Sequence, residues 1–320
     1  MERAFDVLGL LSEVTFCSGE SLANYLGITR AAVWRHVNRL KEAGVDIESI
    51  PGKGYRLKGE FDALRPSEIR ECLSSKGIDS YHSVEVVRVI DSTNAALLRR
   101  SDKKMAALFA EYQSAGKGRR EDKWVSPPGA GLCFSVSRWF DQPQASFSAL
   151  GLVVGVSVVD TLKCLGVKGL KLKWPNDIVF GGSKLAGILI ELQSEVSGPC
   201  FVVIGIGLNI HLSLNARGKI EKSVVDLREI TGKQVSRNLL ASTLLANLQN
   251  DLEVFGRLGF KPFLSAWSDL DSLVGRKIQI NIGSKAVIGE AAGVDDIGAL
   301  RLKVNGEFRQ FLSGHIVELL

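Results

Sequence analysis

Residues 173–189 read KWPNDIVFGGSKLAGIL, and this stretch determines how the middle of the chain is interpreted. Pro175 holds the residue before it in an extended backbone, so Asn176 and Asp177 stand at a strand end or a turn, where polar side chains can face a cleft. Lys184 lies at the mouth of the apolar strand that follows. It can place a point charge in a pocket there, although a lone lysine more commonly reaches into solvent.

On both sides of this stretch, short apolar strands alternate with helical segments and Gly-rich turns, from about residue 83 to residue 210. The alternation indicates a mixed α/β domain. Two apolar runs, 188–192 and 201–210, are interpreted as strands, and the second contains GIGLN at 205–209. Its glycines suggest that something approaches the backbone closely, and Asn209 could contact the edge of a base.

Upstream, residues 113–124 read QSAGKGRREDKW and place two Gly-cation steps close together. Glycines let a ligand approach the backbone, and cations suit phosphate or carboxylate. The stretch is not a dinucleotide-binding fingerprint, because Glu121 stands where the third glycine would be. Nor is any Gly-Lys pair of the chain followed by Ser or Thr, as a Walker phosphate loop requires. Taken alone, the stretch could also be a flexible basic surface loop.

Towards the C-terminus the pattern changes twice. Residues 236–270 are predicted to be helical, because apolar side chains recur near helical spacing at Leu239, Leu240, Leu244, Leu245, Leu248, Leu252 and Phe255. After Trp267, Gly-containing turns separate short strands at 277–282, 285–289, 300–304, 307–311 and 316–319. This spacing favours a small β-barrel.

The N-terminal segment has the pattern of a winged helix-turn-helix. A first helix is predicted at 18–27, and Thr29 can cap a second helix at 30–43. A hairpin follows, with strands at 45–50 and 55–57 around the turn PGKG. Helix, short turn, basic helix and hairpin together predict that the second helix enters the major groove of DNA.

This second helix has an apolar stripe and a basic face. Val33, Val37 and Leu40 recur at the spacing of a buried face, and no acid occurs between residues 21 and 41. The side chains expected to meet DNA are Thr29, Arg30, Trp34, Arg35, Asn38, Arg39 and, on the wing, Lys53. The alternative is an ordinary two-helix hairpin with a solvated basic face. One such motif reads a short half-site, so we expect a two-fold dimer on a near-palindromic operator.

The composition is that of an ordinary globular chain. Of the 320 residues, 45% are hydrophobic and 23% charged, which argues against a disordered protein. The longest apolar run, 149–159, is too short and too interrupted by glycine to span a membrane. The five cysteines are scattered without a zinc-site spacing, and no signal-peptide pattern follows Met1. We therefore expect a cytoplasmic protein without a metal site of its own. The net charge of +5 permits an acidic partner.

Three domains are expected, in a mixed α+β fold. They are a winged helix-turn-helix at 1–62, a central α/β domain at 63–271 and a small C-terminal β-barrel at 272–320. Pro66, within FDALRPS at 61–67, punctuates the first junction.

The order of these motifs resembles that of a biotin protein ligase. The motifs are STN at 92–94, GKGRR at 116–120, Trp124, KWPND at 173–177, KLAGIL at 184–189 and GIGLN at 205–209. The winged helix with PGKGY at 51–55 is similar to that of the bifunctional bacterial type, which is also the biotin operon repressor. The resemblance covers almost the whole chain, and the joint motif set is highly specific. It implies a central domain of the biotin/lipoate ligase type and an SH3-like C-terminal barrel.

The resemblance also implies an activity. Family members use ATP to attach biotin to a lysine of a biotin carboxyl carrier protein, here that of acetyl-CoA carboxylase, through biotinyl-5′-adenylate. Mg²⁺ is expected to accompany ATP. The adenylate-loaded homodimer would bind operator DNA and repress the biotin operon. The alternatives are a lipoate-type ligase and a biotin-sensing transcription regulator whose ligase activity is weak or lost.

Residue roles follow from the resemblance position by position. Biotin binding is implied for Ser92, Thr93, Asn94, Gln113, Gly116, Lys117, Gly118, Arg119, Lys184 and Gly187. Nucleotide binding is implied for Arg119, Arg120, Trp124, Asn176, Lys184 and Asn209. The catalytic set is Lys184, Arg119, Lys117 and Asp177, with Asp177 as the candidate that orients or deprotonates the acceptor lysine.

The chain departs from the family's usual GRGRRG loop at three positions. Lys117 replaces an arginine, Glu121 a glycine, and Asp122 a residue that is often basic. The C-terminal SGHIVELL at 313–320 also has no arginine that could reach the nucleotide. For the dimer, we expect an exposed edge strand near 201–210.

Overall fold

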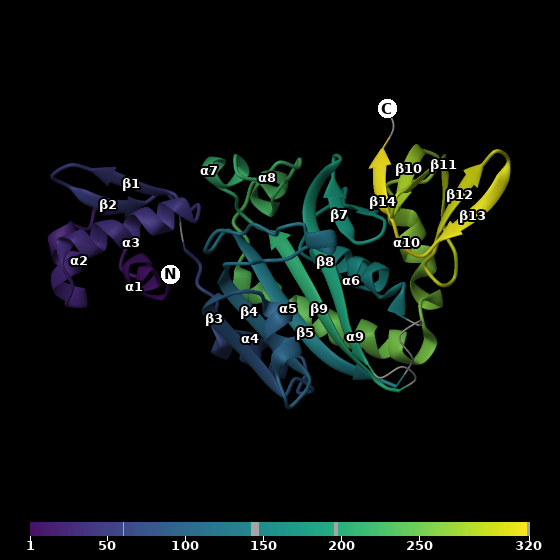
Figure 1. Cartoon of the computed structure of the whole chain (residues 1–320). Coiled ribbons are helices and arrows are strands. Elements are labelled where there is room, and N and C mark those ends of the chain that lie inside the picture. Colours follow the sequence, from purple (N-terminus) through teal and green to yellow (C-terminus); the bar gives the residue numbers. More distant parts are fainter. Residues whose placement is uncertain (60, 142–146, 195–197, 319–320) are drawn as a thin grey trace.

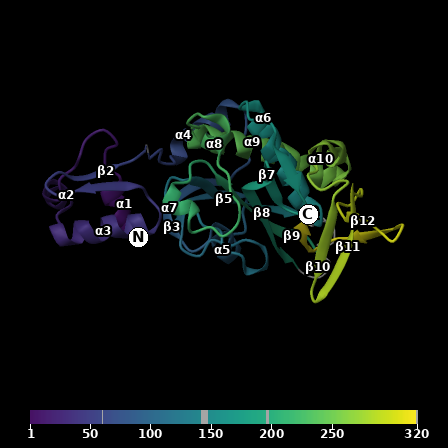
Figure 2. The same cartoon turned by 90° about the horizontal axis from the view of Figure 1, so that it is seen from above.

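The computed structural model describes residues 1–59, 61–141, 147–194 and 198–318, except for the side chains of Glu121, Ser194 and Glu318. Figure 1 shows a helical N-terminal unit, a large central sheet and a small C-terminal sheet side by side, and the turned view of Figure 2 keeps this order. The mixed α+β class is confirmed. Leu319, expected in the last strand, and the side chain of Glu121 lie outside the described part.

The N-terminal unit is a winged helix-turn-helix. It comprises α1 (Glu2–Leu8), α2 (Gly19–Leu26), α3 (Arg30–Glu42), β1 (Ile47–Ile50) and β2 (Gly54–Leu57), and the two strands pair antiparallel. The side chains of Ser18 and Thr29 cap α2 and α3 by accepting backbone N–H groups. Val33, Val37 and Leu40 are fully buried, as expected. Helix α1, which the sequence pattern did not predict, packs on α3 and completes this small core.

The central unit is built on a seven-stranded sheet. Its strands are β3 (Ser83–Ile90), β4 (Ala106–Gln113), β5 (Gly131–Phe140), β6 (Lys171–Lys173), β7 (Asp177–Phe180), β8 (Ser183–Ser194) and β9 (Cys200–Asn209). Their order is β3-β4-β5-β9-β8-β7-β6, and only β3 and β4 run parallel. The expectation of an edge strand near 201–210 is wrong, because β9 pairs with β5 on one side and with β8 on the other.

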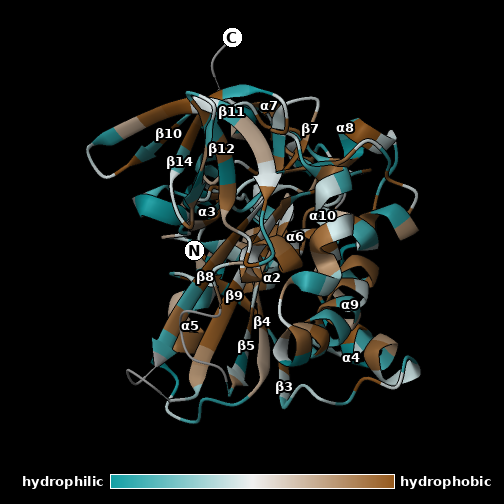
Figure 3. Ribbon diagram, turned by 90° about the vertical axis from the view of Figure 1, so that its right-hand side faces the viewer, coloured by the Kyte–Doolittle hydropathy of each residue, from teal (hydrophilic) through white to brown (hydrophobic). Residues whose placement is uncertain are grey.

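Helices cover both faces of this sheet unequally. The helices are α4 (Pro66–Ser75), α5 (Thr93–Arg99), α6 (Leu150–Cys164), α7 (Leu214–Arg217), α8 (Leu227–Thr231), α9 (Arg237–Leu258) and α10 (Leu264–Leu270). In Figure 3, α4, α6 and α9 lie on one face of the sheet, and stretches of these helices and of the strands are coloured hydrophobic, while α5 lies on the other face. The main core is on the three-helix side. None of the described helices combines the length and hydropathy that a membrane crossing requires.

The predicted helical region 236–270 is divided in two. Helix α9 ends before Gly259, whose backbone φ is positive (+68°), and a 3₁₀ turn at Lys261–Phe263 leads into α10. Of the apolar positions that recur near helical spacing in this region, Leu239 is 50% exposed and the other six are buried. Pro66 does not end an element but begins α4, because proline suits the first helical turn.

The C-terminal unit is a five-stranded antiparallel sheet, consistent with the expected SH3-like barrel. It contains β10 (Lys277–Ile282), β11 (Lys285–Val294), β12 (Leu300–Val304), β13 (Glu307–Phe311) and β14 (His315–Glu318), in the order β13-β12-β11-β10-β14. Strand β11 runs past the predicted end at residue 289, with a register shift between Ala291 and Val294. The buried indole N–H of Trp174 donates to the Gly298 carbonyl at 3.1 Å and joins this unit to the KWPND segment.

Candidate active site

A cavity of about 910 Å³ gathers residues from the central and C-terminal units. Fourteen of the residues expected to contact ligands line it: Ser92, Thr93, Asn94, Gln113, Lys117, Gly118, Arg119, Arg120, Trp124, Asn176, Asp177, Lys184, Gly187 and Asn209. Gly116 does not line the cavity; it is buried, and its carbonyl accepts the Trp124 N–H at 2.9 Å. Motifs spread over more than one hundred residues of sequence thus meet at one place.

One end of the cavity is formed by the first turn of α5. Ser92 caps this helix, and the backbone N–H of Thr93 donates to Oε1 of Gln113 at 2.8 Å. The Asn94 amide nitrogen donates to Oε2 of Glu191 at 2.8 Å and lies 3.3 Å from the Leu189 carbonyl. The three residues of the STN motif are each only 3% exposed. This end is therefore polar, enclosed and tied to two strands.

Two residues that hold this end together were not predicted from the sequence. Ser135 on β5 is fully buried, and its Oγ lies 2.6 Å from Oγ1 of Thr93 and 2.5 Å from Oδ1 of Asn94. Glu191 on β8 is the second, through its contact with Asn94. For Ser135 the available signal was a serine within the otherwise apolar residues 131–136, since a buried hydroxyl requires a polar partner.

The cationic loop between β4 and β5 folds back on itself beside the cavity. The Gly118 N–H donates to the Asp122 carbonyl at 2.6 Å. Lys117 is exposed and Arg119 is half-buried; burial, with the charge of Arg120 second, lowers the pKa of Arg119. Even so lowered, a guanidinium remains charged at neutral pH. Arg120 has a left-handed backbone (φ 53°) and donates to the carbonyl of Asn281 in β10 at 3.3 Å.

Lys184 and Asp177 form an ion pair at the cavity wall. The Lys184 Nζ lies 2.7 Å from Oδ1 of Asp177, with the side chains 25% and 29% exposed. The same ammonium stands 5.6 Å from the centroid of the Trp124 ring, a cation–π distance. Lys184 is therefore held by two partners and does not extend freely into solvent.

The glycines of GIGLN make room for side chains of the protein itself. A Cβ placed on Gly205 would lie 2.3 Å from Oδ1 of Asn94, and one on Gly207 would lie 2.3 Å from Cε2 of Trp124. Both distances are below any tolerable contact, so larger residues would displace Asn94 or the indole. The close approach expected here from the sequence is therefore an approach by Asn94 and Trp124.

Two asparagines expected to contact nucleotide also bind backbone groups. The Asn176 amide nitrogen donates to the Ile188 carbonyl at 2.8 Å. That of Asn209, which is 2% exposed, donates to the Val225 carbonyl at 3.2 Å and lies 3.4 Å from the Lys184 carbonyl. Both side chains tie the cavity wall to neighbouring strands.

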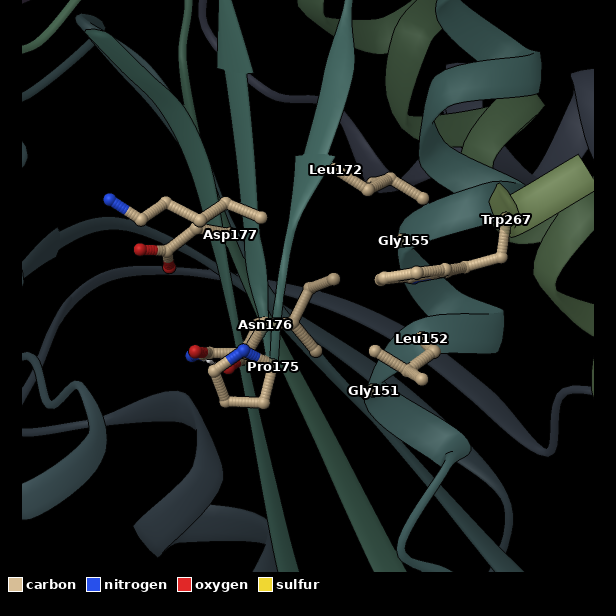
Figure 4. A pocket seen from close by; sticks show the side chains of 10 residues that line it. Gly151, Leu152, Gly155, Leu172, Pro175, Asn176, Asp177 and Trp267 are labelled. Carbon is tan, nitrogen blue, oxygen red and sulfur yellow. Dashed lines mark hydrogen bonds between the residues drawn. The ribbon is translucent and has the colours of Figure 1, made fainter. Parts of the chain in front are cut away.

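Behind the KWPND turn lies an apolar layer. Figure 4 shows Leu172, Leu152 and Trp267 converging on a small void of about 10 Å³, while Asp177 points the opposite way. A void of that size has room for at most one water molecule. The turn therefore has a packed hydrophobic back and a polar front, which fixes the direction of Asp177.

A second loop, residues 211–225, borders the cavity from the other side. It is anchored by the buried carboxylate of Asp226, which accepts the Leu212 N–H at 2.8 Å and contacts Arg217 at 2.6 Å. At its tip the exposed Lys222 pairs with Asp122 of the cationic loop at 2.5 Å. This hydrogen bond is the main cause that lowers the pKa of Asp122. The two loops therefore meet across the cavity rim.

The same loop contacts the end of α3 in the N-terminal unit. The Ser213 hydroxyl donates to the Gly44 carbonyl at 3.0 Å, and the Asn215 amide donates to the Lys41 carbonyl at 3.3 Å. The Lys219 ammonium donates to the Glu42 carbonyl. Three side chains from one border of the cavity thus bind carbonyls at the C-terminal end of α3, which are the groups that a helix terminus leaves unsatisfied.

The residues expected to meet DNA form one open surface. Thr29, Arg30, Trp34, Arg35, Arg39 and Lys53 are exposed, and Asn38 is half-buried. They belong to α3, its cap and the turn between β1 and β2. Trp34 is 58% exposed, which is unusual for an indole on a monomer surface. The surface has the geometry of a helix-turn-helix reading face.

Groups of three or more His, Cys, Asp or Glu side chains that could hold a metal are absent from the described residues.

Comparisons with known proteins agree with both halves of this architecture. Residues 86–209 match the Biotin/lipoate A/B protein ligase family, and residues 3–56 match an HTH domain. The chain is 39% identical over 316 residues to the bifunctional ligase/repressor BirA of Escherichia coli (strain K12), covering 97% of this chain and 95% of that protein. It is 29% identical over 317 residues to the bifunctional ligase/repressor BirA of Bacillus subtilis (strain 168), with 97% of both covered.

Among solved structures, the biotin protein ligase from Aquifex aeolicus in complex with biotin and ATP matches with a TM-score of 0.65 and 26% identity, over 74% of this chain and 98% of that chain. The central and C-terminal units account for the residues that carry the cavity, and the N-terminal unit supplies the helix-turn-helix. The chain belongs to the biotin protein ligase family, in its bifunctional ligase/repressor branch.

Proposed function

We propose that this chain joins biotin to a lysine of the biotin carboxyl carrier protein of acetyl-CoA carboxylase through biotinyl-5′-adenylate, and that its adenylate-loaded dimer represses the biotin operon. The observation that carries the ligase half is the Lys184–Asp177 pair, which shares one cavity with the polar end around Thr93. Because these side chains share one cavity, the pair and the polar end support a site that holds a phosphate beside a small polar ring.

The first step joins two anions. A carboxylate oxygen of biotin attacks the α-phosphorus of ATP, and the bond to pyrophosphate breaks. Lys184, Arg119 and Lys117 offset the repulsion and stabilise the charge that builds on the phosphoryl oxygens. Mg²⁺ that arrives with ATP supplies further charge neutralisation on the triphosphate.

The remaining cavity residues position the two substrates. Ser92, Thr93, Asn94 and Gln113 hold the biotin ring system, with Gly118 and Gly187 allowing close approach at the cavity surface. Gly116 acts from behind the cavity, where its carbonyl accepts the Trp124 N–H. Trp124 covers the adenine, while Asn209, Asn176 and Arg120 complete its surroundings. In this assignment Asn176 and Asn209 act chiefly by holding the cavity wall, since their amide nitrogens donate to backbone carbonyls.

In the second step the carrier lysine attacks the acyl carbon, and AMP leaves. A free amine has a pKa near 10.4, so attack at neutral pH needs a group that orients the amine or takes its proton. Asp177 serves this purpose, because its carboxylate faces the cavity from a turn whose back is packed (Figure 4).

Repression uses the exposed face of α3. Arg30, Arg35 and Arg39 would neutralise phosphates, and Asn38 would reach base edges together with Arg35. Adenylate binding would favour the homodimer, which places two reading helices on a near-palindromic operator. Sedimentation with and without adenylate tests this half, and an unchanged monomer–dimer constant would refute it. A cytoplasmic location remains our prediction; all five cysteines are free thiols.

The ligase half is tested by mass spectrometry of the purified protein with biotin, ATP and Mg²⁺, followed by a biotin carrier domain. We expect retained biotinyl-adenylate and then a biotin-sized mass gain on the carrier. A parallel incubation with lipoate should give neither product. Adenylate without transfer, or no adenylate at all, would identify a biotin-sensing regulator instead of a ligase.

A further inference from the structure

The polar end of the cavity contains a chain of hydrogen bonds whose proton positions can be assigned. Its centre is Ser135, which is fully buried on β5 and touches both Thr93 and Asn94. The Thr93 hydroxyl is also 3.2 Å from Oε1 of Gln113. Each hydroxyl carries one proton, so the partners at the ends of the chain decide where the protons point.

The orientation of the Asn94 amide is set by two acceptors. Its nitrogen faces a carboxylate oxygen of Glu191 at 2.8 Å and the Leu189 carbonyl at 3.3 Å, neither of which donates. The Asn94 oxygen must therefore be the atom that faces Ser135, 2.5 Å away. An amide oxygen only accepts, so the single Ser135 proton points to Asn94.

The Thr93 proton follows from this assignment. The 2.6 Å contact between the two hydroxyl oxygens needs a proton, and Ser135 has none left to give. The Thr93 hydroxyl therefore donates to Ser135, and its longer 3.2 Å contact with Gln113 carries no proton. Oε1 of Gln113 accepts its hydrogen bond from the Thr93 backbone N–H at 2.8 Å. What Thr93 presents to the cavity is then a hydroxyl oxygen with free lone pairs.

We propose that Ser135 is a positioning and specificity-determining residue, which makes Thr93 a hydrogen-bond acceptor and so selects a ligand ring that donates an N–H group. The cyclic urea of biotin has such donors, whereas the dithiolane ring of lipoate has none. This inference rests on the proposed function and names how the same site distinguishes the two substrates. A site that hydrogen-bonds a polar group of its ligand strongly rejects an analogue that lacks this group. An apolar pocket distinguishes far less well between ligands that differ by one small group.

The chain offers a matched control on the same strand. Ser137 is also buried, at 1% exposure, and its hydroxyl donates to the Lys104 carbonyl at 2.8 Å and accepts the Ala106 N–H at 3.1 Å. It does not line the cavity. Ser137→Ala therefore removes a buried serine hydroxyl from β5 without touching Thr93 or Asn94.

The experiment measures biotin and ATP KM, kcat and the unfolding midpoint for the full-length wild type, Ser135→Ala, Thr93→Val, the double variant and Ser137→Ala. We expect Ser135→Ala to raise the KM for biotin roughly tenfold, as the loss of one buried hydrogen bond implies, with kcat and the KM for ATP within about twofold. Because Ser135 acts through Thr93, the double variant should bind biotin no more weakly than Thr93→Val alone. Ser137→Ala should leave the KM for biotin unchanged.

A ligand series tests the polarity directly. Cyclic carbamate analogues of biotin, in which oxygen replaces each ureido N–H in turn, are titrated calorimetrically into the wild type and Ser135→Ala. One analogue should bind the wild type at least about tenfold more weakly than biotin does, and this ratio should fall towards one in Ser135→Ala, where the Thr93 proton is free to turn to the ligand. Circular dichroism of each variant shows that it is folded.

Several results would overturn the inference. The first is an unchanged KM for biotin in Ser135→Ala, and the second is a rise in that KM in the double variant equal to the two single effects combined. The third is a rise in the KM for biotin in Ser137→Ala as large as in Ser135→Ala. The fourth is a ratio of analogue to biotin affinity that is the same in the wild type and in Ser135→Ala. If Ser135→Ala does not fold, the ratio of the two carbamates to biotin in the wild type decides, and equal binding of all three contradicts the proposal. Failure of the wild type to adenylate biotin would instead contradict the proposed function, so the two failures are distinct.

Discussion

The Nζ atom of Lys184 lies 2.7 Å from Oδ1 of Asp177, across two paired strands, β8 and β7. Neither side chain is fully exposed, and the carboxylate is directed by a turn whose back is hydrophobic. The protein's own groups therefore hold the pair in place. In the proposed function, the ammonium of Lys184 serves the first step, which joins two anions. The carboxylate of Asp177 serves the second step, which begins with an amine.

Replacing Lys184 tests the first reaction. Lys184→Gln should slow formation of biotinyl-adenylate by roughly one hundredfold or more, because a charge aimed at the phosphoryl oxygens is removed. Pyrophosphate release in a single turnover measures this step. Transfer from chemically supplied adenylate should change much less. The exposed Lys163→Gln provides the control. Pyrophosphate release within about tenfold of the wild-type rate in Lys184→Gln would contradict the assignment.

Replacing Asp177 should affect the second reaction more than the first. Asp177→Asn retains the shape of the side chain but removes the charge that orients or deprotonates the acceptor lysine. We expect transfer from preformed adenylate to fall by about one hundredfold, with adenylate formation reduced by much less. Rapid-quench transfer to the carrier domain measures the effect. Equal losses in both steps would mean that Asp177 acts only by holding Lys184.

The pair between Asp122 and Lys222 joins the two loops at the cavity rim. Both side chains are more than half exposed, so such a pair is worth at most about 1 kcal/mol. Reversing either charge should speed release of bound adenylate by up to about fivefold, and the double exchange Asp122→Lys with Lys222→Asp should restore the wild-type rate.

Release of radiolabelled adenylate measures this effect, which should fade as salt rises. Reversing the exposed pair of Asp160 and Lys163 gives the control. If the double exchange releases adenylate as fast as the single variants, the pair does not hold the loops together.

The DNA-reading face makes a separable prediction. Changing Arg35 and Arg39 to alanine should weaken operator binding and reduce the slope of log K against log salt by about 0.9 for each phosphate that is no longer neutralised. Ligation should be unaffected, because neither residue lines the cavity. Binding titrations at several salt concentrations measure the slope, with the remote, exposed Arg257→Ala as control. Unchanged affinity and slope would dismiss the assignment of α3.

The buried carboxyl of Asp271 should make the stability of the fold depend on pH. Burial is the main cause that raises the pKa of this carboxyl above 3.8, and Oδ2 is buried without a hydrogen-bond partner among the described residues. Because the folded-state pKa is raised, the contribution of this carboxyl to the free energy of unfolding is fully present below pH 3.8. That contribution is lost as the pH rises through the folded-state pKa. The side chain of Asp271→Asn can still accept the Leu273 N–H but does not ionise, so the variant does not lose this stability as the pH rises.

The melting temperature of Asp271→Asn relative to the wild type should therefore increase as the pH rises above 3.8 through the folded-state pKa of Asp271, and then stay level. Calorimetry across that range measures the difference, and the exposed Asp296→Asn should show no such trend. A difference that is flat or declines with pH would show that burial does not penalise the ionised form.

Local patterns predicted most of the helices and strands, and the motif order predicted residues that gather around one cavity. Val33, Val37 and Leu40 indicated the buried face of α3 because helical spacing is a property of neighbours in sequence. Spatial order is different: nothing within residues 201–210 indicates that strands from 131–140 and 183–194 will cover both its sides. Leu239 shows the same limit, since its exposure depends on what packs against α9.

The candidate site shows a further limit. A glycine in a motif indicates that space is short but does not identify the occupant, and at Gly205 and Gly207 the occupants are Asn94 and Trp124. Ser135 has no motif of its own, and its importance lies in its bonds to residues more than forty positions away. Such partners are determined by the sheet order, which sequence spacing alone does not reveal.

The hydrogen bonds from Ser213, Asn215 and Lys219 to carbonyls at the end of α3 bear on how freely the two halves of this protein can be recombined. A DNA-binding module joined only by a tether could be exchanged for another of any sequence specificity. Here the ligase half itself caps the reading helix through main-chain groups. A transplanted winged helix would function in this chain only if its third helix ended at the same place and with the same carbonyls free. Natural diversification of operator preference is therefore expected to proceed by exchanging exposed side chains along α3, with the end of that helix kept in place.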